Sequence, residues 1–327
     1  MRVVRFVLLL VGAAILALLI TGHLNRLHPA FDSIGHFRLH FAVIGVLIGL
    51  LLIASKSLLG GAALAIVSAL SFFTTVWPTV GTARAVAANQ ETATYRLLQS
   101  NLRFDNQTPE AFLRLLGETK PDVATLEEIP DMWLKRLQTI AGVYPYQHIC
   151  PGRDKIGGVA IVSRRPFIAD GLTYCDGDGA VAVQTVDFAG QPVTIAAMHL
   201  EWPWPKMQPQ QLVWLQPVFD KIKTSSNRVL IGGDMNATPW SAALSHIAEG
   251  TGTRPLPQFR GTWFFNGWPR SLAVWLGLPI DNILSSNGIA LHSATTQREI
   301  GSDHRPILIE FSLTPIAPPE EVSGVTG

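Results

Sequence analysis

The sequence predicts an α/β domain preceded by a helical membrane anchor. Three observations carry this prediction: apolar runs fill residues 1–80, strand and helix patterns alternate from Tyr95 onward, and polar side chains recur where apolar strands end. The chain has 327 residues, 48% of them apolar, and a mean hydropathy of +0.27, which is too high for a wholly soluble domain. We therefore expect a membrane-bound segment at the front and one large folded domain behind it.

Three nearly uncharged apolar runs make up the front of the chain: Val3–Leu24, Leu39–Ala54 and Leu58–Val80. The first and third are long enough to cross a hydrocarbon core, which needs about 20 residues. The middle run is short, and fits either a span extended by its flanks or half of a re-entrant hairpin. A cleaved signal peptide would explain the first run alone, whereas three successive runs favour an anchor. We expect about three helices over residues 1–80 and a linker over 81–94.

Basic residues beside the predicted spans give a weak orientation signal, with three on each side of the bilayer. If the leading Arg2 and Arg5 stay in the cytoplasm, three spans place everything after Val80 outside it. Two spans would reverse this. We expect a multi-pass protein of the cell (inner) membrane whose folded domain is extracytoplasmic.

The chain beyond the anchor is acidic. Residues 1–88 hold six of the 25 Lys and Arg and one of the 24 Asp and Glu, so the rest carries 19 basic and 23 acidic residues. Proteins that bind nucleic acid without sequence preference gain most of their affinity from clustered Lys and Arg. The sequence has no such cluster, so its charge does not favour a nucleic-acid partner.

Cys150 and Cys175 are the only cysteines. Both are expected to end strands, and an even number in an exported domain permits one disulfide. Two separate buried thiols fit the sequence equally well, because the sequence does not fix the distance between them.

Residues 95–313 alternate strands with helices. Helices are expected at Thr108–Lys120, with Thr108 as N-cap and Pro109 in the first turn, from Asp131 as a cap, and at Gln208–Ile222. Two β-rich halves with helices outside are the simplest packing, and the Pro- and Gly-containing residues 314–327 are expected to be a disordered tail. The expected strands are Tyr95–Asn101, Val123–Glu127, Tyr146–Cys150, Gly158–Ser163, Ala180–Asp187, Val193–His199, a strand running into Asp234, Ile280–Ser285, Ile289–Thr296 and Pro306–Leu313.

The most informative stretch is Leu230–Pro239, in which an apolar strand runs into Gly-Gly-Asp-Met-Asn. In an extended segment, residues two apart point to the same side, so Asp234 and Asn236 would project together. A carboxylate and an amide suit a phosphate held beside Mg²⁺. A strand closed by an Asx-type turn would use the same residues, so the pair alone does not decide between a turn and a site.

Other strands also end in, or begin after, polar residues. Each case alone has an ordinary structural explanation, but their recurrence favours a shared site at one edge of the sheets. The residues are Asn101, Glu127, Glu128, His199, Asp303 and His304.

This ordered set resembles the endonuclease/exonuclease/phosphatase family, which includes deoxyribonuclease-like nucleases, sphingomyelinases and inositol polyphosphate phosphatases. The most specific matches are Gly233–Asn236 and Ser302–Pro306, while Leu126–Ile129 is similar to the family's Leu-Gln-Glu-Val and Ile280–Leu284 to its Asp-His-Ile strand. The resemblance covers Tyr95 to Leu313. It implies a catalytic domain at 95–313 folded as a four-layer α/β sandwich, in which two mixed sheets lie face to face with helices on both outer surfaces.

The resemblance implies a metal-dependent phosphoric ester hydrolase. Glu128 would bind Mg²⁺ or Mn²⁺, with Asn101 and Asp303 near the same cation, since hard oxygen ligands are what Mg²⁺ prefers. Two departures leave the number of metals open. Arg103 stands where many relatives carry a second polar metal-shell residue, and Glu127 replaces the usual glutamine beside Glu128.

The same resemblance implies the catalytic roles. His304, held by Asp281, would be the general base or would orient the attacking water, and in an alternative scheme Asp234 activates that water. Asn236 and His199 would donate hydrogen bonds to the non-bridging phosphoryl oxygens as charge develops on them.

Aromatic side chains cluster in two loops beside these residues, after His199 and before Asp281. Tryptophan favours membrane interfaces, although bases also stack on aromatics and core packing is common. With an acidic domain tied closely to lipid, we expect a phospholipid or polyprenyl (pyro)phosphate substrate and the bilayer as partner, with no obligate protein partner. A DNA or RNA nuclease and an inactive membrane-anchored binding protein are the alternatives. The aromatic residues are Trp202, Trp204, Trp263, Phe264, Phe265, Trp268 and Trp275.

Overall fold

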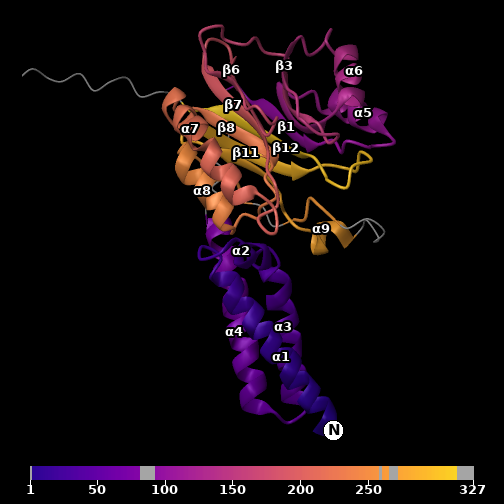
Figure 1. The fold of residues 1–327 in the computed structure, drawn as a ribbon, viewed down its shortest axis with the longest axis vertical. Coiled ribbons are helices and arrows are strands. Elements are labelled where there is room, and N and C mark those ends of the chain that lie inside the picture. The colour runs from indigo at the N-terminus through magenta and orange to yellow at the C-terminus, as the bar shows by residue number, and fades with distance from the viewer. Residues whose placement is uncertain (1, 82–92, 258–259, 265–271, 315–327) are drawn as a thin grey trace, which may run out of the picture.

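A computed structural model describes residues 2–81, 93–257, 260–264 and 272–314. Most of the expected linker at 81–94 and tail at 314–327, together with Phe265 and Trp268, lie outside these residues. Within the described part, the chain from Tyr95 to Leu313 forms two six-stranded sheets, which lie above a long helical bundle built by residues 2–81 (Figure 1).

The first sheet has the strand order β11-β12-β1-β2-β4-β3. β1 pairs in parallel with β2 and antiparallel with β12, so the sheet is mixed. β2 contains a bulge at Glu127/Ile129. The bounds are β1 Tyr95–Asn101, β2 Val123–Ile129, β3 Tyr146–Cys150, β4 Gly158–Ser163, β11 Ile289–Thr296 and β12 Ile307–Leu313.

The second sheet has the order β5-β6-β7-β8-β10-β9 and is also mixed, because β7 and β8 are parallel while the other pairs are antiparallel. Its short edge strand β9 was not expected from the sequence, whereas β5 ends at Cys175, where a strand end was expected. The bounds are β5 Thr173–Cys175, β6 Val181–Asp187, β7 Pro192–His199, β8 Val229–Asp234, β9 Arg254–Pro255 and β10 Asp281–Ser285.

Helices cover the outer face of each sheet, which confirms the expected fold of two mixed sheets flanked by helices. Phe112 of α5 (Pro109–Thr119) and Trp133 of α6 (Asp131–Thr139) are buried on the first sheet. Phe219 of α7 (Gln208–Ser225) and Leu244 of α8 (Ala242–Thr251) are buried on the second. A third apolar cluster joins the inner faces of the two sheets; it includes Leu97, Ile161, Ile195, Ile283 and Phe311.

Two local expectations were wrong. Asp131 does not cap α6; it is the first helical residue, and Pro130 occupies the N-cap position without a side-chain hydrogen bond. The sequence analysis also missed α8. A capping signal for it was present, because the Ser241 hydroxyl accepts a hydrogen bond from the Leu244 amide.

Cys150 and Cys175 form a disulfide, which resolves the two alternatives left open by the sequence. Cys150 ends β3 of the first sheet and Cys175 ends β5 of the second, so the bond crosses between the sheets. The two Cα atoms are 5.4 Å apart.

Replacing both cysteines with serine is expected to lower the free energy of unfolding by about 3.5 kcal/mol, the chain-entropy value for a loop of this length. The sequence separation that sets the loop is 25 residues. Urea unfolding of the detergent-solubilised protein, followed by tryptophan fluorescence, would measure the change. An unchanged midpoint in the double variant would show that the crosslink contributes little.

The bundle consists of α1 (Arg2–His23), α3 (Arg38–Ala54) and α4 (Leu58–Gly81), with the short α2 (Pro29–Gly35) at the end nearest the sheets (Figure 1). Its helices approach closely at small residues: a Cβ added to Gly49 of α3 would lie 2.8 Å from the Gly61 carbonyl oxygen of α4. Close approach at glycines is a typical way for helices to pack in lipid, where burial of apolar surface does not drive association.

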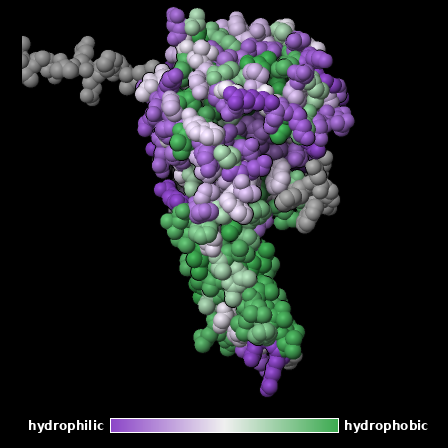
Figure 2. All heavy atoms as spheres, in the orientation of Figure 1, coloured by the Kyte–Doolittle hydropathy of each residue, from purple (hydrophilic) through white to green (hydrophobic). Residues whose placement is uncertain are grey.

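The outer surface of the bundle is apolar, in contrast to the polar surface around the sheets (Figure 2). Among the described residues, α1 and α4 are long and apolar enough to cross a membrane, and α2 with α3 form a third candidate span bent by 59°. The bent pair fits both expectations for the middle run, a span extended by its flank and a re-entrant segment. Exposed apolar side chains include Phe6, Leu10, Leu47, Leu50, Leu59, Leu70 and Trp77.

Candidate active site

The register of the second sheet places three of the expected site residues side by side. His199, the last residue of β7, is opposite Asp234, the last residue of β8, and Asp234 is in turn opposite Asp281, the first residue of β10. Apolar residues fill the preceding strand positions, so the polar ones emerge where the sheet meets its loops. The three side chains therefore come from neighbouring strands at one level of the sheet.

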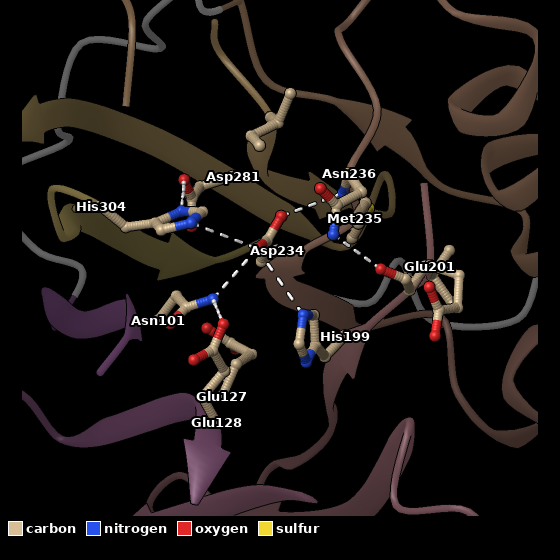
Figure 3. A network of polar contacts seen from close by, with 12 residues as sticks. Asn101, Glu127, Glu128, His199, Glu201, Asp234, Met235, Asn236, Asp281 and His304 are labelled. Carbon is tan, nitrogen blue, oxygen red and sulfur yellow. Dashed lines mark hydrogen bonds and ion pairs between the residues drawn. The ribbon is translucent and has the colours of Figure 1, made fainter. Parts of the chain in front are cut away.

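Asp234 is the centre of the polar network (Figure 3). Its Oδ2 accepts a hydrogen bond from Asn101 Nδ2 at 3.0 Å, and lies 3.5 Å from His304 Nε2 and 3.8 Å from His199 Nε2. On its other side, the His304 ring contacts Asp281, with 2.8 Å between Nδ1 and Oδ2. His304 is thus held in the row Asp281–His304–Asp234, and its Nε2 is directed toward Asp234.

The first sheet contributes Asn101 from the end of β1 and Glu128 from the bulge in β2. Glu128 has a φ of 59°, in the left-handed region that non-glycine residues rarely adopt, and such strain often marks functional positions. The bulge lets consecutive glutamates point apart: Glu127 is fully buried, whereas Glu128 lines the catalytic cavity described below.

Asn101 is buried, and its amide nitrogen bridges two carboxylates, donating to Glu128 Oε1 and Asp234 Oδ2 at 3.0 Å each. Its Oδ1 accepts a hydrogen bond from the Arg103 amide. In this arrangement Asn101 orients both carboxylates, and its role as a direct metal ligand stays a prediction. The Arg103 guanidinium pairs with Asp105 at 2.6 Å.

The expected geometry of Asp234 and Asn236 was wrong. β8 ends at Asp234, and Asn236 has a φ of 45°, so the pair is not extended. The Asn236 amide instead donates to Asp234 Oδ1 at 3.0 Å, which is the Asx-type turn that the sequence analysis had weighed against a site. Turn and site coexist, because the turn leaves both residues lining one cavity. One side-chain N–H of Asn236 donates to the Leu200 carbonyl.

Sequence reasoning missed Gln99, which joins the two sheets beneath this network. Its Nε2 donates to Glu127 Oε2 at 2.8 Å and to Asp281 Oδ1 at 2.9 Å. Gln99 lies two residues before Asn101 on β1, and the only available signal was a polar residue inside an apolar strand.

Burial and the crowding of carboxylates shift the proton affinities of this cluster. Burial raises the pKa of Asp234 to about 6, against the opposing effect of the His304 and His199 rings. Burial alone would lower the pKa of His304, but the carboxylates of Asp281 and Asp234 raise it well above its usual value. Burial and the nearby Asp281 carboxylate raise the pKa of Glu127 well above its usual value, which fits a neutral acid in the position of the expected glutamine.

A cavity of about 470 Å³ opens over these residues. It brings together eight side chains from both sheets and their loops, and it also includes Phe37, which lies between α2 and α3 of the helical bundle. No sequence pattern pointed to Phe37, because it lies far along the chain from every other member. The eight residues are Glu128, His199, Trp202, Asp234, Asn236, Trp263, Asp303 and His304.

A divalent cation fits the donor set of the cavity. Glu128 and Asp303 line it with carboxylate oxygens, the ligands that Mg²⁺ and Mn²⁺ favour. Asp234, Asp281 and His304 form a second candidate group, with ligand atoms all within 4.8 Å of one another. In the latter group the side chains contact each other and Gln99. Each Glu128 oxygen also accepts a hydrogen bond, from Asn101 or from the Phe104 amide, so the assignment of the cation to Glu128 and Asp303 stays a prediction.

The sequence of residues 98–304 matches the model of the endonuclease/exonuclease/phosphatase family. The chain belongs to this family. The match includes Asn101, Glu128, His199, Asp234 and His304, and ends at the last of them. The endonuclease/exonuclease/phosphatase enzymes are metal-dependent phosphoesterases, and this chain is accordingly a metal-dependent phosphoric ester hydrolase.

Solved structures of this family share the fold. A Bacteroides vulgatus endonuclease/exonuclease/phosphatase protein superposes with a TM-score of 0.55 at 17% identity, covering 68% of this chain and 100% of that one. Humanized D. rerio TDP2 gives 0.54 at 19% identity, covering 67% and 99%, and the human Nocturnin catalytic domain gives 0.51 at 17% identity, covering 68% and 95%. No curated protein matched the chain.

Proposed function

We propose that this protein is a membrane-anchored, Mg²⁺-dependent hydrolase of a phospholipid or of a lipid-linked (pyro)phosphate on the outer leaflet. The observation that carries the proposal is the presence of Phe37 in the catalytic cavity. Phe37 immediately precedes Arg38, the first residue of α3, which belongs to the bent candidate span. The catalytic residues therefore lie against the end of the apolar bundle, at the height where lipid phosphates would be.

In the proposed reaction, Glu128 and Asp303 would hold the cation, with Asn101 orienting the Glu128 carboxylate. A divalent cation bound there would neutralise phosphate charge and assist departure of the leaving group. His199 and Asn236 would donate to the non-bridging phosphoryl oxygens. We assign activation of the water to the Asp234–His304 pair as a unit, because groups that interact this closely share their protons.

The charge around the site supports a lipid over a nucleic acid. A neighbouring cavity of about 740 Å³ shares Glu128, His199, Trp202 and Asn236 with the catalytic one. Among the described residues that line it, five are carboxylates, and Arg153 is the single Lys or Arg. A polyanion lying along this surface would be repelled, whereas a lipid with one or two phosphate groups would place them at the cation and the donors described above.

A nuclease is the second candidate, because a fold neighbour, D. rerio TDP2, has been solved with a single-stranded DNA product. The third candidate, an inactive membrane-anchored binding protein, would be expected to lack one or more of the catalytic side chains. The geometry supports activity instead, since the cation-binding, base and phosphate-binding side chains stand together in one cavity.

Substrate preference is expected to distinguish these candidates. The full-length protein, reconstituted in phosphatidylcholine vesicles with Mg²⁺, should release phosphate or headgroup from phosphatidic acid, a phosphodiester phospholipid or a polyprenyl pyrophosphate, and should leave DNA and RNA intact. Degradation of nucleic acid without turnover of any lipid would favour the nuclease. Absence of turnover on all substrates, with tight lipid binding, would favour the binding protein.

A further inference from the structure

The helical bundle is attached to the catalytic domain through specific polar contacts of α2. Asp32, buried in the bundle, accepts hydrogen bonds from the amides of Ala242 at 2.9 Å and Ala243 at 3.2 Å. These two amides lie in the first turn of α8, where backbone N–H groups have no partner within the helix and a carboxylate is favourable. A residue of the bundle thus caps a helix of the catalytic domain.

The same part of the bundle contacts the segment that follows Asn236. The Trp240 indole Nε1 donates to the Gly35 carbonyl at 2.8 Å, and Asn25 Nδ2 donates to the Trp240 carbonyl at 3.1 Å. Because the segment from Asn236 to α8 is short, these bonds and the Asp32 cap fix the chain just beyond a predicted phosphate-binding residue.

A second set of contacts reaches the loop that follows His199. The Ser33 hydroxyl accepts a hydrogen bond from the Trp204 amide at 3.1 Å and lies 3.3 Å from the Trp204 carbonyl. The His36 ring lies against the Trp202 ring, with 4.8 Å between centroids. The bundle therefore contacts both loops that leave the phosphate-binding residues, and the position of Phe37 in the cavity is set from both sides.

Phe37 is half-buried and shares the cavity with two other aromatic residues, Trp202 and Trp263. Three residues further on, His40 Nε2 contacts the Leu276 carbonyl at 2.9 Å, which ties α3 to the short α9 (Ala273–Leu276). α9 presents Trp275, 77% exposed, beside the upper end of the bundle (Figure 1). Exposed tryptophan next to a membrane span is typical of the headgroup region.

We propose that Phe37 is a specificity-determining residue, which contacts the apolar portion of a lipid phosphate and so makes the membrane anchor one wall of the active site. The inference rests on the proposed function. A phosphate held between Glu128 and His199 would have its chain leave the cavity past Phe37, Trp202 and Trp263 toward the bilayer. Phe37 would then stabilise the complex with a lipid substrate and have little to contact in a short water-soluble ester.

The test compares Phe37→Ala with Phe31→Ala in the full-length protein. Phe31 is a half-buried phenylalanine of α2 that does not line the cavity. Phe31→Ala therefore controls for general damage to the segment that contains α2 and Phe37. Two kinds of substrate are used: phosphatidic acid and a polyprenyl pyrophosphate in phosphatidylcholine vesicles, and water-soluble sn-glycerol 3-phosphate, a phosphate monoester without apolar chains. Phe37→Ala is expected to lower kcat/KM for the lipid by about 10- to 100-fold, the effect of losing one buried phenylalanine contact. Turnover of the soluble ester should match that of Phe31→Ala.

The possible results are distinguishable. If wild type hydrolyses only the soluble ester, the proposed lipid function fails. If wild type hydrolyses the lipid and both variants do so equally, the inference about Phe37 is overturned while the function stands. A parallel loss on both substrates would show that Phe37 acts only through folding, which also overturns it. Phe37→Leu, which keeps an apolar side chain in place, should retain most of the lipid activity; equal losses in Phe37→Leu and Phe37→Ala would contradict a contact based on burial.

Discussion

Replacement of His304 by alanine is expected to lower kcat by about 10³- to 10⁴-fold, the range seen when an oriented acid–base residue is lost. His304 is buried and held by Asp281 at 2.8 Å, and its Nε2 lies 3.5 Å from Asp234. Removing the ring would deprive Asp234 of its cationic partner and leave Asp281 without its imidazole. The effect should fall on kcat more than on KM, because the pair acts on the water and not on substrate binding.

A matched histidine tests whether such a loss is specific. His292 is half-buried on β11 and contacts Ser312, remote from the cavity residues, so His292→Ala should keep near wild-type activity. Initial rates on whichever lipid phosphate the wild type hydrolyses, with circular dichroism to compare folding, would measure both. If His304→Ala were as active as His292→Ala, the Asp234–His304 pair could not be the group that activates water.

Replacement of Glu128 by alanine is expected to lower kcat/KM by about 10²- to 10³-fold at fixed Mg²⁺, the usual effect of removing one electrostatic contact to the transition state. Glu128 lines the cavity and is oriented by Asn101 Nδ2 and by the amide of Phe104 at 2.9 Å. Its loss would weaken cation binding, so part of the activity should return at higher Mg²⁺ concentration.

Two further measurements separate metal binding from general damage. EDTA should abolish wild-type activity, and Mg²⁺ or Mn²⁺ should restore it. Isothermal titration calorimetry with Mn²⁺ should show weaker binding to Glu128→Ala than to Glu110→Ala, which removes an exposed carboxylate of α5 that pairs with Arg136. Unchanged Mn²⁺ affinity in Glu128→Ala, or activity in EDTA, would refute the assigned cation site.

The fold was largely predictable, because the periodicity of strands and helices is a local property of the sequence. The motifs Gly233–Asn236 and Ser302–Pro306 are also local, since each consists of neighbouring residues whose side-chain types indicate the site. Strand bounds agree with the expectation within one or two residues at Tyr95–Asn101, Gly158–Ser163 and Ile289–Thr296. Two-residue β9 was missed, and of three-residue β5 only the end at Cys175 was expected, because such short edge strands carry little periodic signal.

The site was only partly predictable. Local sequence identified which residues end strands, but the turn at Asn236 and the bulge at Glu128 depend on positive φ values that residue type does not dictate. Gln99 and Phe37 were missed for a different reason. Their roles come from contacts between segments far apart in the chain, with Gln99 reaching Asp281 across 182 positions, and no local pattern encodes such contacts.

The division of the site between the two sheets links ligand binding to folding. Asn101 and Glu128 come from the first sheet, while His199, Asp234 and Asp281 come from the second, so neither sheet alone offers the complete set of donors. A phosphate held by a cation on Glu128 and Asp303 of the first sheet, and by His199 and Asn236 of the second, binds the native state in preference to any form in which the sheets have separated. At a concentration about 100 times its dissociation constant, such a ligand adds about 2.7 kcal/mol to native stability. The concentration of bound phosphate ester would then govern the stability of the folded protein as well as its turnover.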